Sequence, residues 1–369
     1  MNDNVVEKKT FGGKMKNSFL SIPLGMLFIL LGILLLISNE KSAVRNNKIV
    51  AELRKEIVNI SSDSVDNKNN NRLIATKGKL VYFPESLSDS KFNVSVNTPI
   101  LKRVVEVYQW EENSEEDDDK TTYTYEKKWS EEIIDSSKFK NSSDHMNPSY
   151  KPFESEKYVT ESLKVGNFSL DNVYKNQLSA NNDYYDLSNV TLPEGYVIEG
   201  KYITNCVDMS NPVIGNIRIS YKYGDYSDVS ILGRQENNNI VSYTSKQGTS
   251  VYKMVSGNKT GTEMIDSIEK TNKILKWVKR LIGISLISMG ISAILSILTT
   301  LLSYIPFLGG IANTGISLVA FLLGLAISLV IIAISWFAFR PVLSIILIAA
   351  AVLSVITIRT INKKQNKTS

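Results

Sequence analysis

Three uncharged apolar runs in the C-terminal part of the chain constrain its fold more than any other feature. They cover 281–302, 314–339 and 341–358, and none of them contains Asp, Glu, Lys or Arg. Eighteen or more apolar residues can cross a hydrocarbon core of about 30 Å as a helix. A helix on a soluble core is apolar on one face, whereas these runs are apolar on every face. They therefore predict three membrane-spanning helices.

A fourth apolar run lies near the N-terminus. Residues 19–38 form an uncharged stretch that is long enough to span a bilayer. The alternative is a secretory signal peptide, whose apolar region is usually about 7–15 residues long and precedes a small-residue cleavage site. Here the run ends in Ser38, Asn39, Glu40 and Lys41, which make a poor cleavage site. We therefore favour an uncleaved signal anchor.

Four spans place both termini on one side of the membrane and residues 39–280 on the other. Lysines and arginines flank 19–38 almost equally, with four before it and five just after it. Local charge therefore does not orient this span, and long loops translocate largely regardless of charge. Because 359–369 is basic, we expect 1–18 and 359–369 to be cytosolic tails and the large domain to be lumenal or exoplasmic.

The domain at 39–280 carries strand patterns between two helical patterns. Residues 217–223 alternate Ile and Tyr with polar side chains, which is the period of a strand with one buried face. Apolar residues at helical spacing predict membrane-proximal helices at about 40–60 and 262–280. The second of these either lies on the bilayer surface or packs on the domain. With a further helical run predicted near 162–177, the domain is α+β and rich in strands.

The chain contains few residues that could carry chemistry. Its single cysteine, Cys206, excludes an intrachain disulfide, and with His145 as the only histidine no usual Cys/His zinc site can form. The acidic run at 111–119 lacks the Gly and Glu positions of an EF-hand, so we interpret it as a solvated hairpin tip. A formal charge of +5 that is not gathered on one face makes nucleic acid a poor candidate partner. We expect no catalytic residues, metal or cofactor.

The spans also lack the ionisable residues that mark ion or proton pathways. They contain instead small residues at intervals of four, a spacing that lets helices approach closely in lipid. In the second and third spans these residues are Ser288, Ser292, Ser296, Ala320, Gly324 and Ser328. We expect a packed bundle or a self-association surface there.

Several motifs, taken in order, resemble those of the transmembrane protein 43 (LUMA) family. The motifs are VEVYQW at 105–110, WSEEIIDSSKF at 129–139, HMNP at 145–148, GNIRISY at 215–221, TSKQG at 244–248 and FRP at 339–341. The resemblance extends from the first span to the basic tail. Its motif residues include Trp110, Trp129, Phe139, His145, Asn147, Pro148, Arg340 and Pro341. We interpret the motif residues as determining the fold or, alternatively, forming a partner surface, with Arg340 and Pro341 in a tight turn at the headgroups.

The resemblance implies a multi-pass protein of the endoplasmic reticulum and nuclear inner membrane, or of the cell membrane if the source is bacterial. It also implies a scaffold that self-associates into a homo-oligomer and contacts membrane proteins of the emerin type. We therefore expect a non-enzymatic membrane scaffold. The alternatives are a channel or channel subunit with a pore lined by Ser and Thr, and a membrane-tethered enzyme using carboxylates of the domain.

Overall fold

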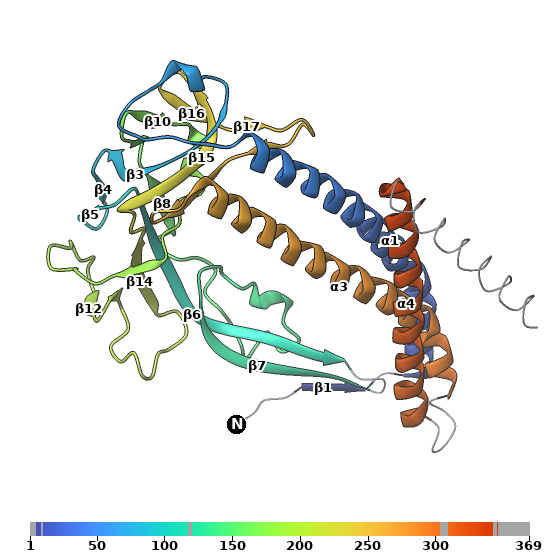
Figure 1. The fold of residues 1–369 in the computed structure, drawn as a ribbon. Helices are drawn as coiled ribbons and strands as arrows, with labels where there is room; N and C mark the ends of the chain where they lie inside the picture. Colours follow the sequence, from blue (N-terminus) through green and yellow to red (C-terminus); the bar gives the residue numbers. More distant parts are fainter. Residues whose placement is uncertain (1–4, 9, 117–119, 303–308, 342–344, 346–369) are drawn as a thin grey trace, which may run out of the picture. The chain divides into compact units, whose positions relative to one another are not determined.

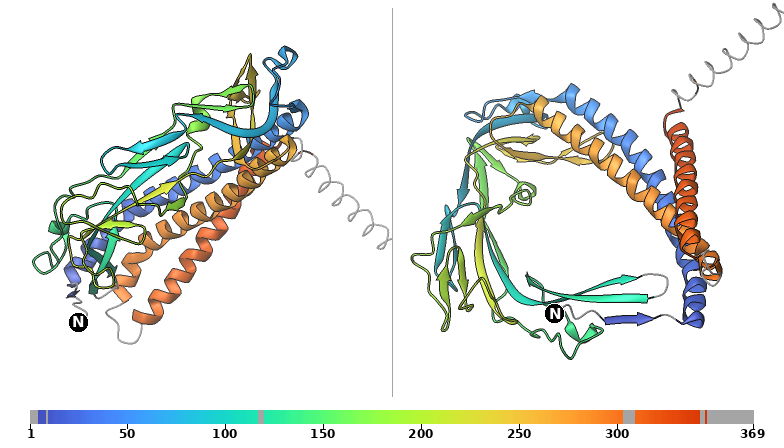
Figure 2. Two further views of the ribbon diagram at one scale, coloured as in Figure 1. Left: turned by 90° about the vertical axis from the view of Figure 1, so that its left-hand side faces the viewer. Right: turned by 90° about the horizontal axis from the view of Figure 1, so that it is seen from below.

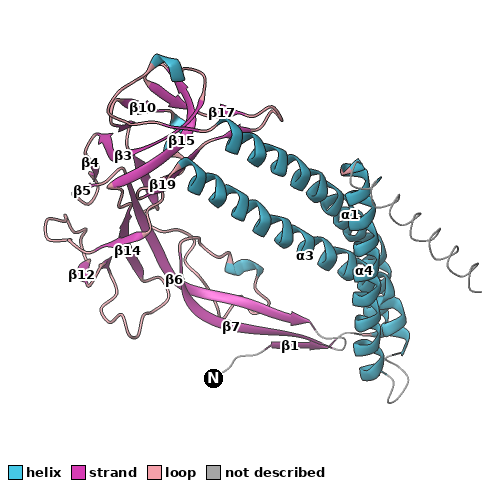
Figure 3. Ribbon diagram, viewed as in Figure 1, coloured by secondary structure: helices cyan, strands magenta, loops and turns pink. Residues whose placement is uncertain are grey.

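The structure, a computed structural model, describes residues 5–8, 10–116, 120–302, 309–341 and 345 (Figure 1). Its internal contacts divide the chain into two compact units. Unit 1 consists of Met1–Lys9 and Glu52–Asp266, and unit 2 of Thr10–Ala51 and Ser267–Ser369. Unit 1 carries the strands and unit 2 carries most of the long helices (Figure 3). The predicted combination of a strand-rich domain with apolar helices is confirmed.

Three long helices dominate unit 2. They are α1 (Phe11–Glu56), α3 (Gly261–Leu302) and α4 (Gly309–Phe339). Stretches of all three, at Phe19–Glu56, Gly261–Leu302 and Gly315–Phe339, are long and apolar enough to cross a membrane. The predicted fourth span, 341–358, lies outside the described residues except at positions 341 and 345.

The two predicted membrane-proximal helices are continuous with the spans beside them. Helix α1 extends through the apolar run to Glu56, and α3 begins at Gly261 and continues into the second span without a break. No proline interrupts α3, so nothing in its sequence ends the helix at the membrane surface. At its first turns, Met264 and Ile265 are fully buried within unit 1.

The first sheet of unit 1 has eight strands in the order β1-β7-β6-β14-β13-β12, with β11 beside β14 and β8 beside β6. Strands β6 and β14 are antiparallel, with Ile217 opposite Val107 and Tyr223 opposite Leu101. The strands are β1 (Val5–Lys8), β6 (Ile100–Glu116), β7 (Lys120–Ser130), β8 (Glu156–Val159), β11 (Asn182–Tyr184), β12 (Val197–Glu199), β13 (Tyr202–Thr204) and β14 (Ile217–Tyr223). Alternate residues of β6 and β14 form a core with the hairpin of β4 (Ser86–Asp89) and β5 (Val94–Asn97). The opposite face of these strands is polar.

The second sheet closes on itself. Its pairings run from β3 through β9, β10, β16 and β15 and back to β3, and β2 and β19 lie beside β3 and β15. The strands are β2 (Val58–Asn59), β3 (Leu73–Phe83), β9 (Ser162–Val165), β10 (Phe168–Leu170), β15 (Asp228–Glu236), β16 (Asn239–Val241) and β19 (Lys253–Ser256). Phe168 and Tyr174 are buried in the core of this small barrel. The short helix α2 (Asn172–Lys175), a hairpin of β17 (Tyr243–Thr244) and β18 (Ser250–Val251), and 3-10 turns at Asn67–Asn69 and Ser136–Lys138 complete the unit.

The predicted helical run near 162–177 is wrong for most of its length. It contains strands β9 and β10, which form an antiparallel hairpin, and only one helical turn at Asn172–Lys175. The turn passes through Gly166, whose φ of +56° suits glycine and breaks the helical pattern. Alternation of exposed and buried residues in β9 shows the strand period that the helical reading overlooked.

The N-terminal segment also contains an element that the sequence did not suggest. Val5–Lys8 forms β1, which pairs antiparallel with β7, Val5 opposite Tyr123 and Lys8 opposite Lys120. Lys140 donates a hydrogen bond to Glu7. A strand pairing requires both strands on one side of a bilayer, whereas a helix crossing once at 19–38 would separate them.

Candidate functional site

In unit 2, glycines bring the backbones of α1 and α3 into direct contact. A Cβ atom on Gly25 would lie 2.6 Å from the carbonyl oxygen of Gly290, and one on Gly290 would lie 2.5 Å from that of Gly25. Two helical turns away, a Cβ on Gly32 would lie 2.6 Å from the Ile287 side chain, and one on Gly283 would lie 2.6 Å from the Leu36 side chain. Gly25 and Gly290 face backbone oxygens, which cannot move aside, so only glycine fits there, whereas at Gly32 and Gly283 a neighbouring side chain would have to shift. Figure 2 shows the two helices side by side.

Sequence reasoning missed this glycine contact. Its signal was a shared spacing of seven residues, between Gly25 and Gly32 in one span and between Gly283 and Gly290 in another. Two helical turns separate residues seven apart, so each pair lies along one face of its helix.

The predicted small-residue faces are used for contacts inside the chain. A Cβ on Gly324 of α4 would lie 2.2 Å from the hydroxyl oxygen of Ser288, so α3 and α4 touch there. Ser296 of α3 lies 2.8 Å, oxygen to oxygen, from Ser21 of α1. Of the remaining three, Ala320 is fully buried, Ser292 is half-buried and the Ser328 hydroxyl donates to the carbonyl of Gly324. Ser288, Ser296 and Gly324 thus lie at contacts between helices of one chain.

A polar contact joins α1 and α3 just beyond their apolar runs. The guanidinium of Arg280 donates to Glu40 over 2.7 Å, and Glu40 is 1% exposed. The Asn39 amide donates to the carbonyl of Lys276. Arg280 also lies over the ring of Trp277, 4.9 Å from its centroid. A buried charge needs such a partner because an isolated one is strongly disfavoured.

In unit 1, four of the predicted motif residues meet at one cluster. His145 is buried, with its ring stacked on Tyr125 at 3.7 Å and its edge packed against Trp110 at 4.6 Å. Asn147 bonds both backbone groups of Trp110, accepting from its N–H and donating to its carbonyl. Phe139 contacts Tyr125 at 6.1 Å between ring centroids. The cluster fastens the loop after β7 to the β6–β7 ribbon.

The other predicted motif residues lie apart from this cluster. Pro148 is half-buried beside Asn147 in the chain, and Trp129 lies on β7. Arg340 follows the last residue of α4, and its guanidinium lies 5.2 Å from the centroid of the Trp336 ring. Pro341 is exposed next to it.

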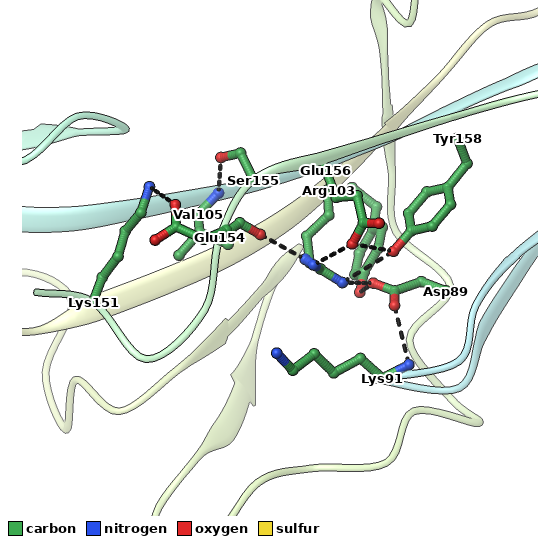
Figure 4. A network of polar contacts seen from close by, with 10 residues as sticks. Asp89, Lys91, Arg103, Val105, Lys151, Glu154, Ser155, Glu156 and Tyr158 are labelled. Atoms are coloured by element: carbon green, nitrogen blue, oxygen red, sulfur yellow. Dashed lines mark hydrogen bonds and ion pairs between the residues drawn. The ribbon is translucent and has the colours of Figure 1, made fainter.

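The most buried ion pair of unit 1 joins Arg103 to Asp89, residues that are 3% and 1% exposed (Figure 4). Arg103 also donates to Glu156 over 2.8 Å and to the carbonyl of Glu154 over 2.9 Å. The hydroxyl of buried Tyr221 donates to Asp89 over 2.7 Å. This Arg103 network ties the β4–β5 hairpin to β6, β8 and β14.

Burial alone would raise the pKa of Asp89. The hydrogen bonds from Tyr221 and Arg103, together with the positive charge of Arg103, outweigh it and hold that pKa below its usual range. Asp89 is therefore ionised at neutral pH, and its charge is compensated.

Arg218 on β14 occupies the polar face of the same sheet. It binds Glu106 through two nitrogens, at 2.7 and 3.0 Å. Its guanidinium carbon lies 4.5 Å from the Trp129 ring centroid and 4.8 Å from that of Tyr202. A guanidinium held by two rings and a bidentate carboxylate is rigidly placed. Trp129, a predicted motif residue, thus supports a charged surface, not the aromatic cluster around His145.

The acidic run predicted as a solvated hairpin tip begins on β6, and its residues 117–119 lie outside the described residues. Glu111 forms an ion pair with Lys128, and Glu112 accepts a hydrogen bond from the Tyr125 hydroxyl. Burial and the hydrogen bond to Glu112 raise the pKa of Tyr125 to about 12. No group of three or more His, Cys, Asp or Glu side chains suited to a metal occurs among the described residues.

Comparisons with known proteins agree with the motifs. The chain is 27% identical to transmembrane protein 43 of Homo sapiens over 356 residues, covering 91% of this chain and 88% of that protein. It is 26% identical to the Rattus norvegicus protein over 358 residues, covering 91% and 88%. It is 27% identical to the Drosophila melanogaster homologue over 340 residues, covering 85% and 87%. No solved structure matches.

The family profile described as transmembrane protein 43 matches residues 107–341. This range contains the aromatic cluster around His145, Arg218 with Trp129 and Tyr202, and helices α3 and α4. The chain belongs to the transmembrane protein 43 family.

Proposed function

We propose that this membrane protein is a non-enzymatic scaffold that holds a binding domain at the membrane surface. One observation carries the proposal: the chain enters and leaves the domain side by side. Arg54 at the end of α1 donates to Asp266 near the start of α3 over 2.7 Å, and the Gly261 N–H donates to Asn59 over 2.8 Å. The two ends of the domain therefore lie side by side. The motif residues Trp110, His145 and Asn147 support the proposal because they pack and brace the domain.

We place both termini in the cytosol and the domain on the lumenal or exoplasmic side. Many side chains in 19–38 are exposed in unit 2, including Phe19, Leu20 and Leu30. Burying one Leu, Ile or Phe side chain contributes about 1.5–3 kcal/mol, so inserting the whole run into the bilayer contributes on the order of tens of kcal/mol. Pairing β1 with β7 contributes about 0.5–1.5 kcal/mol per hydrogen bond, and the exposed Glu7–Lys140 pair adds at most about 1 kcal/mol. Insertion therefore outweighs the pairing, so in the membrane we expect residues 5–8 to give up the pairing with β7 and to remain in the cytosol.

Protease protection of sealed vesicles tests this topology. We expect a tag placed before Val5 to be digested from the cytosolic side and a tag in the 208–212 loop to be protected. A tag before Val5 that is protected together with the domain would show that β1 stays on β7 and that 19–38 does not cross. Detergent lysis, which must expose both tags, is the control.

We place the protein in the endoplasmic reticulum and nuclear inner membrane if the source is a eukaryote, and in the cell membrane if it is a bacterium. The proposed partners are the bilayer, further copies of this chain, and membrane proteins of the emerin type where the organism has them. Because the small-residue faces already pack inside the chain, self-association needs another surface. The outward face of α4, with exposed Leu318, Leu322 and Leu329, is the surface we assign to it.

Light scattering on the detergent-solubilised protein tests self-association. We expect a protein mass above the 41.3 kDa of one chain, and a lower mass when Leu318, Leu322 and Leu329 are replaced by Ala. The matched control replaces exposed Leu20, Leu24 and Leu27 of α1 by Ala and is expected to keep the larger mass. A strictly monomeric wild type that crosslinks to no protein in cells would contradict the scaffold.

A further inference from the structure

A polar pocket opens on the face of the first sheet that points away from its core. Its volume is about 360 Å³, within the range of small-molecule sites. Val104, Glu106, Ser220 and Arg218 line it from β6 and β14, which are neighbouring antiparallel strands. Further walls come from Glu131 after β7, Asp183 on β11 and Tyr202 on β13. Nearly all of the lining is polar or charged, so an apolar ligand does not fit.

Two lysines lie side by side in the lining of this pocket. Lys102 and Lys222 are direct partners in the register of β6 and β14, and both line the pocket. Like charges opposite one another on a sheet are destabilising. The charge of Lys102 is compensated by an ion pair with Glu131, with 3.0 Å between the ammonium nitrogen and the carboxylate oxygen. Asp183 of β11 lies opposite Lys222 on its other side in the sheet, yet no ion pair joins Lys222 to a carboxylate within the part of the chain that the structure describes.

The remaining charges of the pocket are already paired. Arg218 is held by Glu106, and Lys201 donates to Asp183 over 2.6 Å. Three ion pairs therefore leave one surplus positive charge, at Lys222. The cationic end of the pocket is thus confined to the Lys102–Lys222 pair.

A hydrogen-bond acceptor in the pocket also lacks a donor. Asp183 uses Oδ2 for Lys201, whereas its Oδ1 is buried and has no partner among the described residues. A buried acceptor without a donor costs about 1–3 kcal/mol. A ligand hydroxyl would satisfy it, and a second anion would not.

From the Lys102–Lys222 pair and the unpartnered Asp183 oxygen, we infer that the pocket binds a phosphorylated polyol. Its phosphate, with a charge of about −1.5 to −2 for a monoester, lies between the Lys102 and Lys222 ammonium groups. One of its hydroxyls donates to Asp183 Oδ1. Arg218, held in place by Trp129 and Tyr202, forms one rigid wall. The pocket is therefore already open before a ligand binds. This chemistry occurs in free sugar or inositol phosphates and in the headgroups of inositol and glycerol lipids.

Calorimetric titration of the full-length protein in detergent tests the inference with two kinds of probe. One arm uses myo-inositol 1-phosphate and glycerol 3-phosphate, and the other uses short-chain phosphatidylinositol. We expect at least one probe to bind and Lys222→Gln to weaken that binding about tenfold, with Lys102→Gln acting in the same direction. Binding of the free phosphates assigns a soluble ligand, whereas binding of the lipid alone assigns a headgroup.

The matched control is Lys164→Gln, an exposed lysine on β9 of the barrel, and it is expected to leave binding unchanged. A second measurement guards against misfolding: Lys222→Gln removes a like-charge contact, so the ligand-free variant should unfold at the same temperature as the wild type or slightly above it. Absence of binding by every probe overturns the inference. So does binding that Lys164→Gln weakens as much as Lys222→Gln.

Discussion

Asp89→Asn is expected to be among the most destabilising single substitutions in the strand-rich domain. Asn has nearly the same shape but no charge, so among the described residues Arg103 keeps only Glu156, which is 54% exposed, as an anionic partner. Removing one member of a buried ion pair costs about 3–5 kcal/mol. For a domain of this size the expected fall in unfolding temperature is about 6–20 °C. Near-ultraviolet circular dichroism of the full-length protein in detergent measures it, because most tyrosines lie in the domain.

Glu156→Gln is the matched control because it removes the exposed carboxylate from the same guanidinium. Exposed pairs contribute about 0–1 kcal/mol, so the unfolding temperature should change little. If the two substitutions destabilise equally, the Asp89–Arg103 pair does not brace the domain as its burial indicates.

The pH dependence follows from the lowered pKa of Asp89. An unfolded chain binds this proton near the ordinary Asp pKa of about 3.9, and the folded domain binds it only at lower pH. Ionised Asp89 therefore contributes its full stabilisation above about pH 4. That contribution is lost as the pH falls through the folded pKa. Asp89→Asn should remove this part of the acid-induced loss of stability.

Local sequence patterns predicted the spans and the strand-rich domain because a span or a strand is encoded by residues that are close together in the sequence. Uncharged runs identified the apolar stretches of α1, α3 and α4, and alternation identified β14. The helical reading of 162–177 failed because Gly166 places a hairpin turn inside a pattern of mixed period. Pairing of β1 with β7 joins segments more than a hundred residues apart, and no local pattern encodes such a partner.

The candidate sites were less predictable for the same reason. Asp89 and Tyr221 are 132 residues apart, and Arg218 meets Glu106 from 112 residues away. Each of these residues is an ordinary strand residue in the sequence. The motif residues were predicted as one set. Their division between the cluster around His145 and the Arg218 surface required the register of β6 with β7 and β14.

The glycine contact between α1 and α3 had a readable signal, and it leads to the second prediction. Gly290→Leu is expected to separate the two helices. Its Cβ would meet the backbone oxygen of Gly25, with Ile29 at 2.7 Å on the other side. Overpacking against movable side chains costs about 1–3 kcal/mol. A backbone carbonyl in a helix cannot turn aside, so the cost here should exceed that range.

Crosslinking measures this separation directly. Ser21 and Ser296, with hydroxyl oxygens 2.8 Å apart, report on the pair when both are replaced by Cys. A protease site inserted in the domain then cuts the chain between them, and a disulfide keeps the two fragments together on a non-reducing gel. We expect efficient crosslinking in the otherwise wild-type chain and a severalfold lower yield with Gly290→Leu.

Gly315→Leu provides the matched control because it adds the same side chain to a helix of the same unit. No atom of the described residues lies within 4 Å of a Cβ at Gly315, so the added leucine meets open space there and the crosslink should form as before. An equal loss of crosslinking in both variants would mean that any added bulk perturbs the helices. If both variants crosslinked as efficiently as the otherwise wild-type chain, the packing of α1 against α3 would not depend on the contact between Gly25 and Gly290. Only a selective loss with Gly290→Leu establishes that backbone contact at these glycines holds the membrane helices of this chain together.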